Sequence, residues 1–189
     1  MNTLSRTIGC IAIVACVRFT SAASGASAQG NTPTDFLLTP GKAGSFQIGD
    51  PVDDVYQRVG RENVSLVDLF KEGLFTPAIQ IRLPGSADPA LVADIREWPC
   101  GSHAIYGLSV RDRRFRTREG LGVGSSVLEL RLAYSVEASH AEGQSVIVDG
   151  LKMSFAVDGD SEDDRSRVTS VWLWPDPEAV RLRRCPDKR

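Results

Sequence analysis

Two short segments of the chain place apolar residues at helical spacing, and both follow the same local pattern. The first runs from residue 46 to 60 and the second from residue 121 to 135. Each has an apolar residue, a glycine, a residue able to cap a helix and then an amphipathic stretch, which predicts a short helix. The apolar stripes that predict the two helices are Val52, Val55, Tyr56 and Val59, and Val127, Leu130 and Tyr134.

Residues suited to helix ends flank both segments. Asp50 is expected to cap the first helix, with Pro51 in its first turn and Gly60 at its C-terminal end. Either Ser125 or Ser126 is expected to cap the second helix. These caps limit both helices to a few turns.

Alternating apolar and polar positions predict antiparallel strands after each helix. Asp149-Gly150 between two alternating runs indicates a tight hairpin, and Pro77 favours an edge position or a bulge. Residues 91–98 are expected as a strand, with a short helix capped by Asp88 as the alternative. The strands are expected at residues 65–70, 74–83, 91–98, 104–110, 146–148, 151–157 and 168–174.

Helix, hairpin and further strand therefore occur twice in the same order. We expect an α+β fold in which two helix-plus-antiparallel-sheet repeats pack as one domain. The first unit would span residues 46–118, and the second would span residues 119–189 with a C-terminal tail. The Thr-, Pro- and Gly-containing stretch at residues 29–45 is expected to be a linker.

The N-terminus has the order of a secretory signal peptide. A short polar stretch with Arg6 precedes an apolar run of about ten residues, and Ala26-Ser27-Ala28 forms a small-x-small cleavage site. Residues 1–28 are therefore expected to be removed. In the alternative interpretation Ile13-Val14-Ala15-Cys16 is a lipobox, Cys16 carries lipid, and the protein is anchored to a membrane.

The remaining cysteines fit an exported protein. Cys100 and Cys185 form an even pair without a CxxC motif, so an oxidising compartment favours a disulfide between them. We expect a periplasmic or secreted protein, or an outer-membrane lipoprotein if Cys16 is lipidated. The formal net charge of −2 gives no argument for nucleic-acid binding.

The layout resembles two groups of exported bacterial proteins: the tandem-repeat fold of the β-lactamase-inhibitor protein and the SmpA/OmlA type of outer-membrane assembly lipoprotein domain. Both start a helix with apolar-Gly-x-x-apolar-x-x-apolar and continue with antiparallel strands. Residues 105–124 also look like part of uncharacterised secreted proteins of Gram-negative bacteria. The resemblance covers core and turn positions and implies no functional residue. The matching residues are Ile48, Gly49, Val52, Val55, Gly60, Val123, Gly124, Val127 and Leu130.

Motifs for catalysis, cofactors and metals are weak throughout. The two histidines, His103 and His140, stand in no nucleophile motif. The glycine-rich stretch 120–124 lacks the third glycine of a dinucleotide fingerprint and the Lys-Ser/Thr of a P-loop. The acidic stretch 158–164 fails the EF-hand pattern at its sixth and twelfth positions. We therefore expect no enzyme activity, no cofactor and no metal.

Two groups of side chains are candidates for partner binding. Arg111, Arg113, Arg114 and Arg116 crowd one segment, and Trp172 and Trp174 alternate with apolar residues on the last strand. If Val171 and Leu173 face the core, both indoles lie on the opposite sheet face and could form a protein-binding hot spot. We expect a non-enzymatic interaction module of the bacterial envelope that binds another envelope protein, and not nucleic acid. The alternative is a carrier or sensor of a small anionic or lipidic ligand.

Overall fold

The computed structural model describes residues 34–71, 73–97, 101–135 and 139–175. The predicted signal peptide, Cys16, Cys100 and Cys185 lie outside the described residues, so the roles expected for them stay predictions. Within the described part of the chain, no helix is both long enough and apolar enough to cross a membrane.

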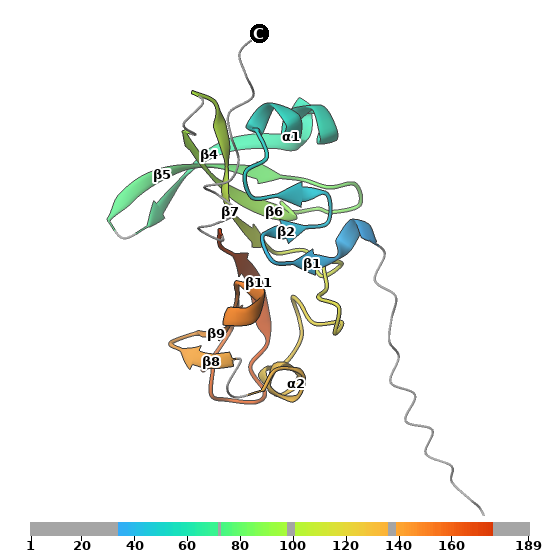
Figure 1. Ribbon diagram of the computed structural model, residues 1–189, viewed down its shortest axis with the longest axis vertical. Helices are drawn as coiled ribbons and strands as arrows, with labels where there is room; N and C mark the ends of the chain where they lie inside the picture. The colour runs from blue at the N-terminus through green and yellow to red at the C-terminus, as the bar shows by residue number, and fades with distance from the viewer. Residues whose placement is uncertain (1–33, 72, 98–100, 136–138, 176–189) are drawn as a thin grey trace, which may run out of the picture.

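One antiparallel sheet of eight strands forms the main body (Figure 1), and its strand order is β4-β5-β6-β7-β11-β10-β9-β8. Each half is a meander of four strands consecutive in sequence, and the two halves join where β7 pairs with β11. The strands are β4 (Val64–Lys71), β5 (Leu74–Ile81), β6 (Leu91–Glu97), β7 (His103–Val110), β8 (Ser139–Glu142), β9 (Ser145–Val148), β10 (Met153–Val157) and β11 (Val168–Leu173).

A second, smaller sheet precedes the first helix. It consists of β1 (Leu38–Thr39), β2 (Lys42–Ala43) and β3 (Phe46–Gln47), in that order, after the 3-10 helix η1 (Thr34–Phe36). The prediction of a linker up to residue 45 is therefore wrong for residues 34–45. Its Gly and Pro residues make tight turns between short strands, and the apolar residues between them are buried in the core.

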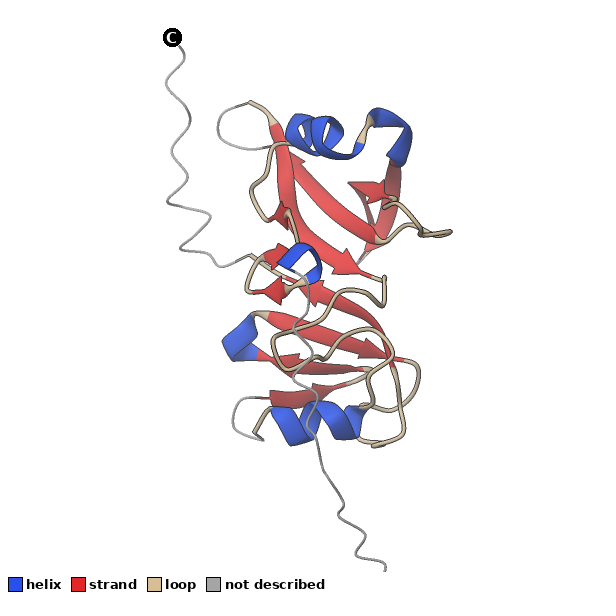
Figure 2. Cartoon of the chain, turned by 90° about the vertical axis from the view of Figure 1, so that its right-hand side faces the viewer, coloured by secondary structure: helices blue, strands red, loops and turns tan. Residues whose placement is uncertain are grey.

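The two predicted helices are present and short. They are α1 (Val52–Val59) and α2 (Val127–Ala133), and Figure 2 shows them towards opposite ends of the molecule. Ser126 caps α2 and forms a reciprocal capping box with Glu129. The predicted cap of α1 is wrong, because Pro51 occupies the N-cap without a side-chain hydrogen bond. The Asp50 carboxylate instead accepts hydrogen bonds from Gln47 N–H and Arg58.

Two further 3-10 turns connect regular elements of the chain. These are η2 (Arg61–Asn63), directly after α1, and η3 (Asp149–Leu151), at the predicted Asp149-Gly150 hairpin. Strand β8 was not predicted from the sequence.

The hydrophobic core lies on one face of the eight-stranded sheet, here called the covered face. The small sheet and both helices contribute to the same buried cluster as this face. Phe155 and Leu108 are fully buried members from the large sheet, while Val55 and Leu130 are buried members from the helices. The opposite face, here called the open face, carries Trp172 between the buried Val171 and Leu173.

The predicted fold class, α+β with two helix-plus-sheet repeats, is wrong. The described chain is mainly β, with 11 strands in two antiparallel sheets and two α-helices of eight and seven residues. Local patterning correctly placed both helices, but each ends after about two turns, and strands make up most of the regular secondary structure among the described residues. Because β7 and β11 pair directly, the large-sheet strands of the two predicted units belong to one continuous sheet.

Candidate interaction surface

The end of the β4–β5 hairpin projects beyond the rest of the sheet (Figure 1). β4 and β5 pair along eight positions, from Val64 opposite Ile81 to Lys71 opposite Leu74. β6, however, pairs with β5 only from Ala78 onward. Pro77 stands where β5 leaves β6, so its missing N–H costs no hydrogen bond to that strand. The four residue pairs beyond this point have no third strand beside them.

The β4–β5 hairpin carries the largest group of exposed apolar side chains in the described chain, and three of them, Phe70, Leu74 and Phe75, lie on its projecting end. Leu66, Phe70, Leu74 and Phe75 are 67%, 67%, 70% and 73% exposed. The rings of Phe70 and Phe75 face each other across the hairpin with centroids 5.2 Å apart. Clustered exposed apolar residues on a soluble protein typically mark an interaction site. We call these four residues the hairpin patch.

Sequence analysis missed the hairpin patch although it placed both strands. The alternation put Phe75 on the same face as Ile79 and Ile81, and this is correct, because these residues share a side of β5. Ile79 and Ile81 are fully buried, whereas Phe75 is exposed. The difference arises because β6 lies beside β5 only at residues 78–81, so residues 74–77 have neither β6 nor the core next to them. Pro77 was the local signal, but only the pairing register shows how far the hairpin projects.

Lys71 ties the hairpin end to the open face of the sheet. Its ammonium lies 2.6 Å from Asp94 Oδ2 on β6 and 4.3 Å from the centroid of a Trp172 ring on β11. The three residues line a cavity of about 290 Å³ together with Leu69, Val92 and Arg111. The hairpin end therefore bends over the open face and is held there by an ion pair and a cation–π contact.

Asp94 is the buried side of this contact. The residue is 8% exposed, and its Oδ1 atom has no hydrogen-bond partner among the described residues. A buried carboxylate is costly unless a cation is near, so Lys71 is strongly favoured in this position. The tie should thus restrict the conformations of the hairpin.

The two tryptophans considered as a binding hot spot lie only partly at the surface. Trp172 and Trp174 are both half-buried. The Trp172 indole lies against Gly107 of the neighbouring strand β7, where an added β-carbon would come within 2.5 Å of the ring. Trp174 follows the end of β11, and its backbone N–H donates to the Lys152 carbonyl. The face assignment of Trp172 is correct, but Lys71 of the hairpin lies over its ring.

Introducing a β-carbon at position 107 should displace the indole. Gly107→Ala is expected to lower the free energy of unfolding by about 1–3 kcal/mol, the usual cost of overpacking. In a Trp172→Ala background the same change should be nearly neutral, which a double-mutant cycle of chemical denaturation measures. Equal costs in both backgrounds would contradict the contact between these residues.

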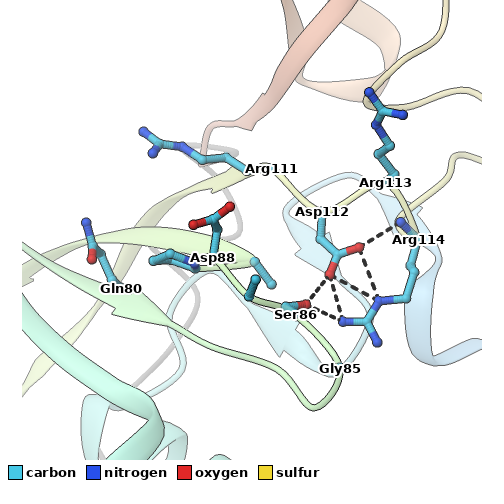
Figure 3. Close-up of a pocket in the computed structure, with 11 residues that line it drawn as sticks. Gln80, Gly85, Ser86, Asp88, Arg111, Asp112, Arg113 and Arg114 are labelled. Carbon is cyan, nitrogen blue, oxygen red and sulfur yellow. Dashed lines mark hydrogen bonds and ion pairs between the residues drawn. The ribbon is translucent and has the colours of Figure 1, made fainter.

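A second cavity lies beside the arginine cluster (Figure 3). It has a volume of about 680 Å³ and lies between the β5–β6 loop and the segment after β7. Arg114 is fully occupied there, since its guanidinium donates to Asp112 Oδ2 at 2.7 Å, to Ser86 Oγ at 2.7 Å and to the Pro84 carbonyl at 2.9 Å. This residue therefore clamps two loops together.

Arg116 is also occupied by a structural contact. Its guanidinium donates to the Val123 carbonyl at 2.9 Å. Arg111 and Arg113 line the cavity, and their side chains make no hydrogen bond or ion pair with the other described residues. Of the four predicted arginines, these two are thus available for an anionic ligand.

The loop clamp should make stability depend on pH. Burial alone would raise the pKa of the Asp112 carboxyl, but hydrogen bonds from the Arg114 side chain and backbone and from Ser86 outweigh it and lower the pKa to about 2. A carboxyl whose pKa is lower in the folded state adds stability above its unfolded pKa. That stability is lost as the pH falls from about 4 to about 2.

Asp112→Asn should therefore lower the free energy of unfolding by about 1–2 kcal/mol near neutral pH, and by progressively less below about pH 4. The figure is reduced from the full value of the pKa shift because Arg114 is 38% exposed. Asp163→Asn is the matched control, since its partner Arg165 is 90% exposed and no measurable change is expected. Urea denaturation of both variants across this pH range makes the comparison.

The other sequence candidates do not assemble into a catalytic or metal site within the described residues. His103 is exposed on β7, and no group of three or more possible metal ligands occurs there. In the acidic stretch, Asp158 and Asp160 accept backbone N–H groups of the same loop, and Asp163 pairs with Arg165. The N–H of Gly124 donates to the Val168 carbonyl, so it serves the fold and not a phosphate.

Comparison with known proteins adds little about function. No protein-family model matches the sequence, and no curated protein matches it. The structure is similar to the uncharacterized protein YfeY from Escherichia coli, with a TM-score of 0.48 and 12% identity over 74% of this chain and 97% of that chain. This distant similarity carries no functional argument. The resemblance to the β-lactamase-inhibitor protein and to SmpA/OmlA domains stays a prediction.

Proposed function

We propose that this chain is a non-enzymatic protein-interaction module of the bacterial envelope, and that the hairpin patch is its contact surface. The observation that carries the proposal is the group of four apolar side chains, each at least 67% exposed, on a hairpin that projects from the sheet. Leaving this area in water is unfavourable, and a partner that covers it recovers the hydrophobic free energy.

The contacts that hold the hairpin patch in place also favour binding. Phe70 and Phe75 support each other across the hairpin, and Lys71 fastens the end of the hairpin to Asp94. A surface that is already ordered loses less conformational entropy when it binds. Aromatic side chains are typical binding hot spots because they bury much area with few rotatable bonds.

Removing the two rings should abolish most of the binding. The double substitution Phe70→Ser, Phe75→Ser is expected to weaken partner affinity by at least about 30-fold, which corresponds to a loss of about 2 kcal/mol or more at a hot spot. The measurement is affinity capture from an envelope extract of the source cells, followed by titration of the captured partner. The melting temperature of the variant should stay close to that of the unchanged chain.

Leu132→Ser is the matched control. Leu132 is 79% exposed on α2, so this variant also removes an exposed apolar side chain, but away from the hairpin. It should capture the partner normally. Equal loss in both variants would show nonspecific adhesion and contradict the proposal.

The second candidate is a carrier or sensor of a small anionic or lipidic ligand. It is favoured by Arg111 and Arg113, which line the larger cavity without acidic partners among the described residues. Binding through two exposed guanidiniums should weaken as salt increases. If the double substitution Arg111→Gln, Arg113→Gln abolishes binding of such a ligand while the Phe70→Ser, Phe75→Ser variant still binds it, this alternative replaces the first proposal.

A further inference from the structure

We infer that the outer edge of β4 receives an extended segment of the partner as an additional strand, and that this segment places a basic residue opposite Asp68 with apolar residues two positions to either side. This inference rests on the proposed function and adds the binding mode and the chemistry of the partner.

The outer edge of β4 is an open strand edge. β4 is the first strand in the sheet order, and its described backbone pairs only with β5. Every second residue of an edge strand directs its N–H and C=O away from the sheet, where another strand can bind them. β4 therefore offers hydrogen-bonding groups to a chain lying alongside it.

The two edges of the sheet differ in a way that singles out β4. At the other edge, β8 has only four residues, and short edge strands are a common protection against unwanted pairing. β4 has eight residues, contains no proline, and carries exposed apolar side chains. A long, apolar and open edge is expected where strand addition is the function, as in other proteins that bind peptides in this way.

The order of side chains along β4 defines what the added strand must carry. Leu66, Asp68 and Phe70 alternate on one face, and all three are exposed. The Asp68 carboxylate has no hydrogen bond or ion pair with the other described residues. Across two neighbouring strands, opposite charges and apolar pairs are favourable. A lysine or arginine opposite Asp68, flanked by apolar residues opposite Leu66 and Phe70, satisfies all three positions.

The same charge argues against a second copy of this chain as the added strand. In a two-fold antiparallel pair of β4 strands, the register that sets Leu66 opposite Phe70 also sets Asp68 opposite Asp68. Two like charges directly opposite each other are destabilising. The edge therefore suits a different chain with a basic residue at the centre.

The test uses random twelve-residue peptides displayed on phage and selected on the full chain. Enriched peptides should share a lysine or arginine with apolar residues two positions before and after it. On an Asp68→Lys variant the enriched central residue should become acidic. Glu142→Lys is the matched control, because it reverses an exposed acid on the opposite edge strand β8 and should leave the enrichment basic.

A synthetic copy of an enriched peptide then tests the main-chain contacts. It should lose at least about tenfold in affinity on Asp68→Lys, because an attractive pair becomes repulsive. Two further versions of the peptide are methylated at every second backbone nitrogen, one at the odd and one at the even positions. One version should lose binding and the other should keep it, because only every second N–H of the added strand points towards β4. Binding of both versions would overturn strand addition.

The outcomes separate this inference from the proposed function. Peptides that require Phe70 and Phe75 but show no basic preference overturn the inference and leave the hairpin patch as a contact surface. Peptides that bind the Phe70→Ser, Phe75→Ser variant equally well overturn both. Failure to enrich any peptide counts against strand addition alone, since the capture experiment tests the patch independently.

Discussion

Replacing Phe115 with alanine should lower the free energy of unfolding by about 3–5 kcal/mol, the cost of removing a fully buried aromatic ring. Phe115 lies between β7 and α2 and is 1% exposed. Its ring packs edge-on against Phe36, with centroids 5.2 Å apart. The neighbouring backbone binds the same segment, because Arg116 N–H donates to Phe36 C=O and Leu38 N–H donates to Arg116 C=O. Phe115 therefore anchors the small sheet to the main body.

The loss should be concentrated in the small sheet. Guanidinium denaturation measures the total, and hydrogen exchange should show the amides of residues 38–47 losing more protection than those of β7. Phe75→Ala is the matched control, since it deletes the same ring at a position that is 73% exposed and should cost at most about 1 kcal/mol. An unchanged exchange rate in the small sheet would contradict the anchoring role.

Within α2, two leucines only two positions apart should respond in opposite ways to alanine. Leu130 is fully buried and Leu132 is 79% exposed. Leu130→Ala should lower the free energy of unfolding by about 2–5 kcal/mol, because it leaves a cavity between α2 and the covered face. Leu132→Ala should change it by no more than about 0.5 kcal/mol, since alanine favours a helix at least as well.

The comparison is internally controlled because both variants remove the same atoms from the same helix. Thermal and urea denaturation of the pair measure the difference directly. Similar costs at the two positions would mean that α2 does not present one buried face to the sheet. A small cost at Leu130 alone would mean that the site collapses around the smaller side chain.

Much of the local structure could be predicted from periodicity. The stripe of Val52 and Val55 identified α1, the stripe of Val127 and Leu130 identified α2, and alternation identified β7 and β11 within a residue or two. These signals are reliable because each element must bury one face. The fold class was nevertheless wrong, since periodicity does not reveal that the supposed linker pairs with itself or that β7 pairs with β11.

The candidate site was harder to predict than the elements. Alternation with core residues marks Trp172 as a candidate for binding, yet Lys71, far away in the sequence, lies over its ring. Phe70 and Phe75 have the sequence pattern of ordinary members of alternating strands, yet they are exposed. Exposure depends on which strand lies beside a residue, and this information is long-range.

The amino-acid sequence by itself determined where strands and short helices form and which side of each faces the core, because a 2- or 3.6-residue period records burial locally. Only the tertiary structure decided which strands are neighbours, and hence that β5 extends past β6 and that β4 is left as an open edge. Strand pairing joins residues distant in sequence, and its register depends on the packing of the whole sheet. For that reason the hairpin patch became visible only in the folded chain.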